Sequence, residues 1–263
     1  MSIRPEKRVW DKTWGQDSKK VQISHTDKMI FNYLIKEINP KDSDIIEMGC
    51  GRGVLSYLIS KYNPNTITLM DFSKEALARA KNLFQDIQNV HYMDGDLLNI
   101  KTDKKYDIVF SSGVVEHFSS KLRKKAIENH FEVSKDKVAI IVPAKPHYNT
   151  IRHKKIRTIQ SFGWQEAFSK SELNEYCKQH KDFHVIISKR FFSMYGITLF
   201  ELLSIDSENT IIDIYNKVIK IINKIFFKLQ IYRIINFLLK PIEDKFGGLL
   251  LVIAEKRIIP PND

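Results

Sequence analysis

Two patterns of apolar residues take turns along the first 190 residues of the chain. Short, almost wholly apolar runs predict buried β-strands, and they lie at residues 45–48, 66–70, 90–93, 107–111 and 138–142. Apolar residues spaced three and four apart predict helices between them, at residues 25–38, 54–61, 74–84 and 120–133. This alternation is typical of an α/β protein whose mainly parallel sheet carries helices on both faces.

The rhythm changes after about residue 145, where Pro143, Pro146 and a basic stretch predict a loop that leaves the sheet. A helix at residues 169–180 and a strand at residues 183–190 follow. A segment rich in Ile, Leu and Phe then fills residues 211–240, before a last strand at residues 249–256. We expect four parts, which are an N-terminal arm and lid helix (1–40), an α/β core (41–195), a hydrophobic and basic helical insertion (196–246), and the last core strand with its tail (247–263).

The composition fits a folded globular protein, because 43% of the 263 residues are hydrophobic and 28% are charged. The two cysteines, Cys50 and Cys177, predict neither a disulfide framework nor a structural zinc site. They fit a reducing compartment, and the first ten residues lack the apolar stretch of a secretory signal, so we expect a cytoplasmic protein. The formal net charge of +11 suits nucleic acid, an anionic membrane or an acidic substrate, and equally a solvated surface without such a partner.

A glycine-rich turn follows the first predicted strand. The sequence DIIEMGCGRG places Gly49, Gly51 and Gly53 at every second position, and a helix comes next. Glycine lets the backbone turn tightly and approach a ligand where a Cβ would obstruct it. The spacing differs from the dinucleotide fingerprint G-x-G-x-x-G, and Glu47 would repel a pyrophosphate. The same acid suits a cationic group such as an ammonium.

Acidic or small polar residues also stand at the ends of the next three strands. Asp71 ends the second strand, Asp96 follows the third, and the fourth runs into Ser111. Ligands of open α/β sheets bind along this edge, where a carboxylate such as Asp71 can accept both hydroxyls of a ribose. Each acid also has a plainer interpretation, because Asp71 could cap the helix that starts near Ser73 and Asp96 could be a solvated loop residue.

Taken in order, the motifs E-x-G-x-G-x-G, D-F, G-D-L and D-I-V-x-S-x-x-V-x-E-H resemble those of the class I S-adenosylmethionine (SAM)-dependent methyltransferases, in particular the branch that modifies small molecules, lipids and glycans. The resemblance covers roughly residues 25–195 and 249–256, and several ordered motifs must match together. It implies a Rossmann-like, doubly wound sheet of seven strands in the order 3-2-1-4-5-7-6, with the last strand antiparallel and a helical C-terminal insertion.

The resemblance also implies SAM as the cofactor and assigns its methionine part to the first glycine turn. By that resemblance, Gly49 and Gly51 approach the methionine part through the backbone. Glu47 positions the SAM ammonium, and Ser111 offers its carbonyl to the same group.

The resemblance places the adenosine part of SAM at the ends of the second and third strands. There the resemblance implies that Asp71 holds the ribose hydroxyls, Phe72 packs on the adenine, and Asp96 accepts from the adenine amino group beside the Leu97 amide. No metal is implied. The expected cofactor-binding residues are Glu47, Gly49, Cys50, Gly51, Gly53, Asp71, Phe72, Asp96, Leu97 and Ser111.

Candidate catalytic residues must project from the ends of strands four and five, beside the methyl group. Positioning supplies most of the acceleration of a methyl transfer, but an alcohol acceptor benefits from a base. His117, His147 and Tyr148 are the candidates. His117 can instead be a structural histidine, and the other two can belong to an exposed basic loop. Trp10 and Trp14 lie where related proteins place a lid over the cofactor, or they pack as an ordinary N-terminal arm.

The segment at residues 211–240 carries one acid and six bases, and Lys217, Lys220, Lys224 and Lys228 recur at helical spacing. No run reaches the ~18 uncharged apolar residues that a membrane span needs. Two interpretations stay open. The segment is either a helical cap packed over the sheet or a surface that engages anionic lipid head groups or a lipid-linked acceptor.

We therefore expect a SAM-dependent methyltransferase that acts on a small-molecule acceptor, with an oxygen atom of a glycan, lipid or quinone-like intermediate as the target. It would be cytoplasmic and in contact with the membrane surface if the second interpretation of residues 211–240 holds. An RNA methyltransferase and a non-catalytic SAM-fold binding protein are the alternatives. Nucleic acid is the less favoured partner, because residues 111–114 read SSGV where nucleobase amino-methylation commonly uses Asn/Asp-Pro-Pro-aromatic. The oligomeric state stays open.

Overall fold

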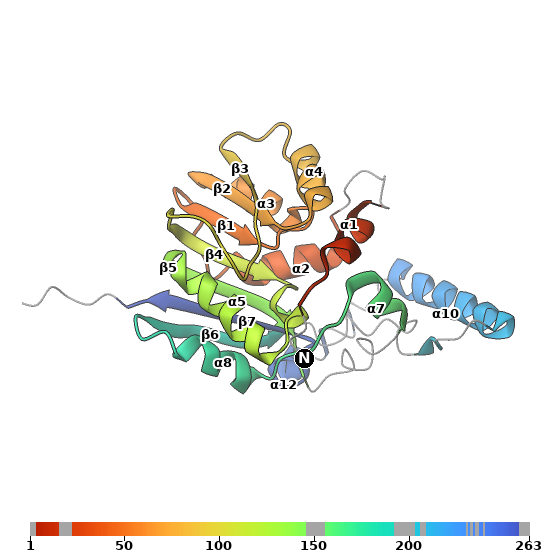
Figure 1. The fold of residues 1–263 in the computed structure, drawn as a ribbon. Coiled ribbons are helices and arrows are strands. Elements are labelled where there is room, and N and C mark those ends of the chain that lie inside the picture. The colour runs from red at the N-terminus through yellow and green to blue at the C-terminus, as the bar shows by residue number, and fades with distance from the viewer. Residues whose placement is uncertain are drawn as a thin grey trace, which may run out of the picture.

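The computed structural model describes residues 4–15, 23–145, 156–191, 203–205, 209–229, 231, 234, 237–238 and 240–257. Its centre is one seven-stranded sheet with helices on both faces (Figure 1). The strands are β1 (Asp44–Met48), β2 (Thr66–Asp71), β3 (Val90–Asp94), β4 (Tyr106–Ser112), β5 (Ser134–Pro143), β6 (Phe183–Phe191) and β7 (Leu249–Lys256).

The order of the strands is β3-β2-β1-β4-β5-β7-β6, as the family resemblance implies. The first five strands are parallel to one another, whereas β7 runs antiparallel to both β5 and β6. The expected Rossmann-like fold class, with its antiparallel last strand, is therefore confirmed. The parallel strands end along one edge, which places the tips of β1, β2, β3 and β4 together.

Helices fill the connections, and three of them begin at polar caps that the sequence supplies. Ser24 with Asp27 and Ser169 with Glu172 form capping boxes before α2 and α8, and Ser73 caps α4. The bounds are α1 (Lys7–Gly15), α2 (His25–Leu34), α3 (Val54–Ile59), η1 (Ser60–Tyr62), α4 (Lys74–Leu83), η2 (Val115–His117), α5 (Ser120–Glu132), α7 (Ile156–Phe162), α8 (Lys170–Lys178), α10 (Thr210–Lys228), η3 (Lys240–Ile242) and α12 (Glu243–Phe246).

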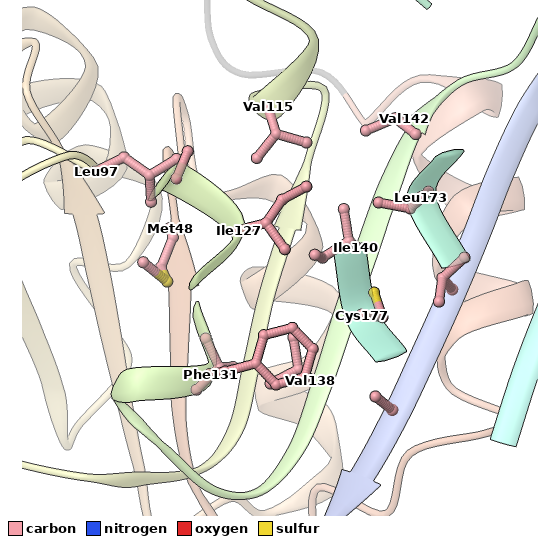
Figure 2. Packing of buried hydrophobic residues seen from close by; sticks show 14 of the residues in the cluster. Met48, Leu97, Val115, Ile127, Phe131, Val138, Ile140, Val142, Leu173 and Cys177 are labelled. Carbon is pink, nitrogen blue, oxygen red and sulfur yellow. The ribbon is translucent and has the colours of Figure 1, made fainter. Parts of the chain in front are cut away.

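The core has two layers, because alternate residues of each strand face opposite sides of the sheet. On β5, Val138, Ile140 and Val142 pack toward α5 and α8, together with Phe131 of α5 (Figure 2). Ala139 and Ile141 face the opposite side, where α2 and α3 cover the sheet. The helix α4 packs on that second side over β2.

Two boundaries differ by four residues from the sequence prediction, and the others differ by at most two. The strand β5 starts at Ser134, four residues early, because its polar first residues pair with β4 and β7 without forming an apolar run. The helix α2 ends at Leu34 and not at residue 38, since the backbone N–H groups of Glu37 and Ile38 both donate to the Leu34 carbonyl in a closing turn. In the described part of the chain, no helix combines the length and the apolar character needed to cross a membrane.

Candidate active site

The glycine turn between β1 and α3 stands at the carboxyl edge of the sheet. Gly49, Gly51 and Gly53 adopt φ values of +71°, +53° and +71°, a region that favours glycine. A Cβ built on Gly49 would lie 2.7 Å from a methyl carbon of Val114, and one on Gly51 would lie 3.0 Å from the ring of Trp14. The turn therefore needs glycine both for its backbone conformation and for the neighbours that close around it.

The side chain of Glu47 is buried directly beneath this turn. One of its oxygens accepts hydrogen bonds from the Ser56 backbone N–H (3.2 Å) and the Ser56 hydroxyl (2.6 Å). Burial raises the pKa of Glu47 to about 8, although the bonds from Ser56 oppose this change. A cation placed beside the carboxyl would favour its ionised form. This position therefore suits an ammonium group.

The carboxyl of Asp71 ends β2 and faces the glycine turn. Its Oδ2 accepts the Gly51 backbone N–H at 2.8 Å, and its Oδ1 accepts the Ser73 backbone N–H at 2.9 Å. Burial raises the pKa of Asp71, while the backbone donors act in the opposite direction. Asp71 does not cap α4 through its own side chain, because the Ser73 hydroxyl accepts the Ala76 backbone N–H.

Asp96 and Leu97 follow β3 and extend the same edge. The Asp96 carboxylate accepts the Leu98 backbone N–H at 2.9 Å and lies 3.8 Å from the Arg4 guanidinium. Leu97 is buried in the core below. Asp96 is therefore fixed by its loop while its carboxylate stays partly accessible.

One cavity of about 650 Å³ joins these groups. It is lined by nine of the residues expected at the site, which are Glu47, Gly49, Cys50, Gly51, Asp71, Phe72, Asp96, Leu97 and His117. Gly53 and Ser111 do not line it. Gly53 precedes α3, where an added Cβ would lie 3.0 Å from the Phe84 ring, and the Ser111 hydroxyl lies 2.8 Å from His130 Nε2. Their expected roles toward the cofactor stay predictions.

Two helices from distant parts of the chain form the outer wall of the cavity. Trp10 and Trp14 of α1 line it, and so does Phe162 at the end of α7. The Thr13 hydroxyl donates to the Ser161 carbonyl at 2.5 Å, and the rings of Trp10 and Phe162 lie 6.2 Å apart. The arm is thus packed over the cavity and against α7, an arrangement that agrees with the lid interpretation.

His117 lies in the wall of the cavity and is buried. Its Nδ1 lies 3.0 Å from the Trp164 carbonyl, which can only accept, so Nδ1 carries the proton of the neutral ring. Burial lowers the pKa of His117 to about 4. The ring of Trp10 contacts it edge-on at 5.0 Å. His117 therefore ties the loop after α7 to the turn after β4 and presents an unprotonated Nε2.

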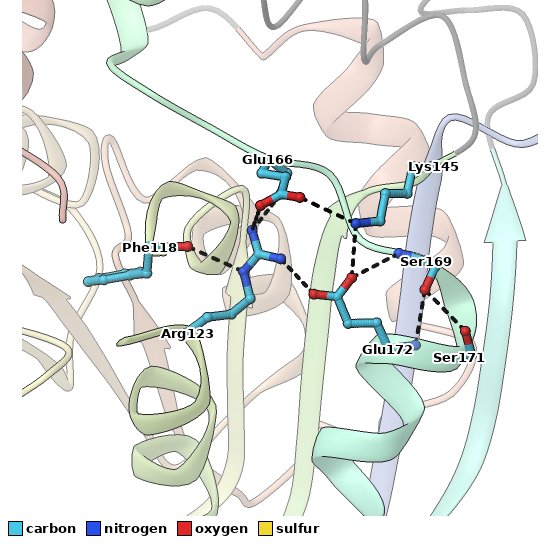
Figure 3. Close-up of polar contacts among 7 residues, drawn as sticks. All are labelled: Phe118, Arg123, Lys145, Glu166, Ser169, Ser171 and Glu172. Carbon is cyan, nitrogen blue, oxygen red and sulfur yellow. Dashed lines mark hydrogen bonds and ion pairs between the residues drawn. The ribbon is translucent and has the colours of Figure 1, made fainter. Parts of the chain in front are cut away.

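A buried arginine holds the same turn in place. Arg123 of α5 is 1% exposed and donates to the carbonyls of Phe118 (3.3 Å) and Glu166 (2.9 Å) and to the Glu172 carboxylate (2.7 Å) (Figure 3). Its guanidinium also lies 4.0 Å from the centre of the Phe168 ring. These contacts join α5, α8 and the loop between α7 and α8 behind the cavity wall.

Glu116 belongs to the V-x-E-H motif but was not among the residues predicted for the site. This residue is buried and lines the cavity beside His117. An acid next to the apolar pair Val114–Val115, inside a motif at a strand end, is the signal that could have found it. His147 and Tyr148, the other catalytic candidates, lie outside the described residues, so their roles stay predictions. No group of three or more residues that could hold a metal occurs among the described residues.

The helix α10 leaves a regular apolar stripe exposed. Its members recur at spacings of three and four residues, have exposures of 49–76%, and are Ile211, Ile214, Val218, Ile221 and Ile225. The four lysines of the predicted basic stripe are exposed along the same helix, which lies apart from the sheet (Figure 1). A cap packed over the sheet would bury these apolar side chains. This exposure is what the membrane-surface interpretation requires of α10, and both interpretations of the insertion stay predictions.

Comparisons with known proteins agree with this geometry. Residues 45–137 match a family model described as a methyltransferase domain. A malonyl-acyl-carrier protein O-methyltransferase from Ilyobacter polytropus is 34% identical over 84 residues, which cover 32% of this chain and 31% of the relative. A ubiquinone biosynthesis O-methyltransferase from Coxiella burnetii is 26% identical over 106 residues, or 40% of this chain and 45% of the relative.

Among solved structures, magnesium protoporphyrin IX methyltransferase from Synechocystis PCC 6803 with bound SAH (S-adenosylhomocysteine) has the same fold. Its TM-score is 0.57 at 14% identity, over 95% of this chain and 93% of that chain. The chain thus spans about a third to a half of the two curated relatives, and nearly all of this structure. Residues 45–137 therefore match a methyltransferase domain, within a chain whose strand order is that of the Rossmann-like fold of this solved structure.

Proposed function

We propose that this protein transfers a methyl group from SAM to an oxygen atom of a small-molecule acceptor. The observation that carries the proposal is the continuous cavity of about 650 Å³ that reaches from Asp71 and Asp96 past the glycine turn to Glu116 and His117. Its size is within the range of about 300–1,000 Å³ that is usual for small-molecule sites. A binding protein without turnover would need no pocket for an acceptor beyond the SAM-binding groups.

The glycine turn fits the methionine part of SAM. Gly49 and Gly51 leave bare backbone facing the cavity, where a Cβ would strike Val114 or Trp14. The Glu47 carboxyl lies beneath and suits the ammonium group. Ser112 and Gly113, at the end of the neighbouring strand β4, also line the cavity.

The second and third strand ends fit the adenosine part. The Asp71 carboxylate accepts backbone hydrogen bonds from Gly51 and Ser73, and its two oxygens together have about four sites for acceptance, which leaves capacity for a ribose hydroxyl. Phe72 and Leu97 line the cavity where the adenine would pack, and the Asp96 carboxylate can accept from its amino group. These assignments follow the family resemblance, and the geometry of the described residues is compatible with each of them.

When bound, SAM supplies an electrophilic methyl group on a positively charged sulfur. The task of the protein is then to hold the acceptor in line with that group and to exclude water. The helices α1 and α7 provide the cover, because Trp10, Trp14 and Phe162 close the outer side of the cavity. His117 and Glu116 are the polar groups of the wall formed by the turn after β4.

The remaining walls favour an organic acceptor. Five further residues that line the cavity are apolar, namely Ile30, Phe118, Val142, Phe162 and Leu249. The two curated relatives are both named as O-methyltransferases, which supports oxygen as the accepting atom. A glycan, lipid or quinone-like intermediate is the acceptor class that we propose.

We also propose that α10 brings the enzyme to anionic membrane surfaces, where a lipid or lipid-linked acceptor would be found. The exposed apolar stripe can enter the head-group region, and Lys217, Lys220, Lys224 and Lys228 can contact anionic lipid. The only acid in the helix is Asp213.

Calorimetric titration with SAM and with SAH tests the proposed function. Wild type should bind both without added metal, and Asp71→Asn should weaken binding by about tenfold or more, because the ribose loses a charge-assisted hydrogen bond. The matched control is Asp86→Asn, since Asp86 is exposed and does not line the cavity. Wild type that binds neither compound would refute the proposal. Retention of RNA that weakens steeply with salt would instead favour the RNA alternative.

A further inference from the structure

Glu116 carries a buried carboxyl oxygen that lacks a partner. The residue is 2% exposed, and its Oε2 has no hydrogen-bond partner in the part of the chain that the structure describes. The side chain nevertheless lines the cavity. Leaving a buried polar atom unpaired costs free energy, so such atoms in native proteins call for an explanation. A ligand group that enters the cavity and pairs with Oε2 provides one.

The position of Glu116 places such a ligand group at the Gly49 end of the cavity. Val114, which begins the same turn, is the residue that a Cβ on Gly49 would strike at 2.7 Å. A Cβ on Gly113 would lie 3.5 Å from Glu116 Oε1. Asp71 lies two strands away from β4 in the sheet order. Glu116 therefore faces the part of the cavity where the proposed function puts the methyl group.

His117 completes a pair with Glu116. Because Nδ1 of His117 donates to the Trp164 carbonyl, its Nε2 is the free ring nitrogen, and it lies 3.9 Å from Glu116 Oε1. Both side chains are almost fully buried, and both line the cavity. Two groups that can each take a proton thus lie side by side.

The basic residues of the cavity lie elsewhere. Arg4 pairs with Asp96, and Arg52 belongs to the glycine turn. Arg123, the cation that acts on Glu116 through space, already donates to two carbonyls and one carboxylate behind the wall. A carboxylate acceptor would place a second negative charge beside the ionised carboxylate of Glu116, and the two charges would repel each other. An uncharged hydroxyl meets no such repulsion.

We propose that Glu116 is the catalytic base of the reaction and that the acceptor is a hydroxyl group, not a carboxylate. This inference rests on the proposed function and narrows its substrate class. The acceptor oxygen forms a bond to the methyl carbon while the carbon–sulfur bond breaks, and the sulfur keeps the electron pair. The hydroxyl proton passes to Oε2 of the Glu116 carboxylate and then to solvent. His117, whose Nε2 lies 3.9 Å from Oε1 of Glu116, does not itself hold the proton.

The electrostatic surroundings agree with this role. Burial raises the pKa of Glu116 to about 8, and the nearby Arg123 acts in the opposite direction. His117, with its pKa lowered to about 4, is neutral and adds no charge. A base whose pKa lies near the working pH transfers protons efficiently. Since only the ionised form of Glu116 accepts a proton, turnover rises as the pH rises toward about 8.

A probe that carries both acceptor types tests the substrate class, and 3,4-dihydroxybenzoate has two phenolic hydroxyls and one carboxylate. With methyl-labelled SAM, the expected product is an alkali-stable methyl ether. Glu116→Gln keeps the size of the side chain but cannot take the proton, so it should lower turnover by about a hundredfold with unchanged SAH affinity. Glu132→Gln, on the exposed side of α5, is the matched control. An alkali-labile ester, or full turnover by Glu116→Gln, overturns the inference.

A second measurement does not depend on turnover. In SAH-loaded protein with ¹³C-labelled glutamate carboxyls, one signal should titrate with a pKa near 8, be absent from Glu116→Gln, and move when 3,4-dihydroxybenzoate is added. The inference is overturned if the Glu116 signal has an ordinary carboxyl pKa, or if it does not move when the probe is added. This holds even if the enzyme methylates neither the hydroxyls nor the carboxylate of the probe. Calorimetry is done first, because failure to bind SAH would refute the proposed function and not the role of Glu116.

Discussion

The Asp71 carboxylate accepts the backbone N–H of Gly51 at 2.8 Å, so the acid at the end of β2 is fastened to the glycine turn that follows β1. The same carboxylate accepts the Ser73 backbone N–H at 2.9 Å. Asp71 is therefore part of the framework of the cavity as well as one of its polar groups. A change at this residue should have two separable effects, one on ligand affinity and one on folding.

Asp71→Ala should lower the free energy of unfolding by about 2 kcal/mol or more in the absence of any ligand, because two buried N–H groups lose their acceptor. Asp71→Asn keeps one acceptor oxygen and should cost less. Urea denaturation of both variants measures the difference, with Asp86→Ala as the exposed control expected within about 0.5 kcal/mol of wild type. Equal stability of Asp71→Ala and wild type would show that these hydrogen bonds do not support the turn.

Glu47 should make SAM affinity depend on pH. Without ligand, burial keeps the pKa of Glu47 at about 8, so the carboxyl is largely protonated near neutral pH. The ammonium of SAM favours the ionised form, which means that binding releases a proton. Affinity should therefore rise with pH between about 5.5 and 7.5, at most tenfold per unit.

Calorimetry in buffers with different ionisation enthalpies counts the released protons. Glu47→Gln should abolish the release and flatten the pH dependence while the protein stays folded. Proton release that persists undiminished in Glu47→Gln would place the ammonium elsewhere.

The strands of the sheet could be predicted from the sequence because both faces of each central strand are buried, which leaves a nearly continuous apolar run. β1, β2 and β4 were found in this way, to within a residue or so. The first residues of β5, from Ser134 onward, are polar, so the start of this strand could not be predicted from an apolar run. The Asp107 carboxylate accepts the Asp44 backbone N–H at the start of β1, so this acid lies at the opposite end of the strands from the glycine turn.

The site was predictable where several residues must occur in order, as around Gly49 and Asp71. A single residue carries no such context. The sequence does not tell whether Glu116 is exposed or buried, and its unpaired oxygen follows only from the packing of α5 and the loop after α7. Nor could periodicity decide between the two interpretations of α10, because a cap and a membrane-surface helix share the same amphipathic pattern.

Arg123 should be essential for the stability of the cavity wall. Arg123→Ala removes hydrogen bonds to Phe118 and Glu166 and leaves Glu172 without its guanidinium, so the free energy of unfolding should fall by about 3 kcal/mol. Lys125→Ala on the same helix is the control, because its ion pair with Glu132 is exposed and should contribute about 0.5 kcal/mol or less. Denaturation curves compare the two. A loss at Arg123 no larger than that at Lys125 would contradict the role of this network.

The helix α10 should bind membranes through its exposed face. Each lysine near an anionic surface contributes about 1 kcal/mol, so Lys217, Lys220, Lys224 and Lys228 together can hold the enzyme reversibly. The attraction acts over a Debye length and should weaken with salt. Flotation with vesicles of phosphatidylcholine alone, and of phosphatidylcholine with phosphatidylserine, tests this at low and high salt.

Two sets of variants separate charge from apolar insertion. Replacement of the four lysines by glutamine should abolish binding to the anionic vesicles, and Ile214→Ser with Ile221→Ser should weaken it at every salt concentration, because both isoleucines are exposed on the stripe. The matched control replaces Lys101, Lys121, Lys170 and Lys178, which lie outside α10, and should bind as wild type does. If wild type floats with no vesicle, or if the control variant loses binding equally, α10 does not dock on membranes and the acceptor reaches the cavity from solution.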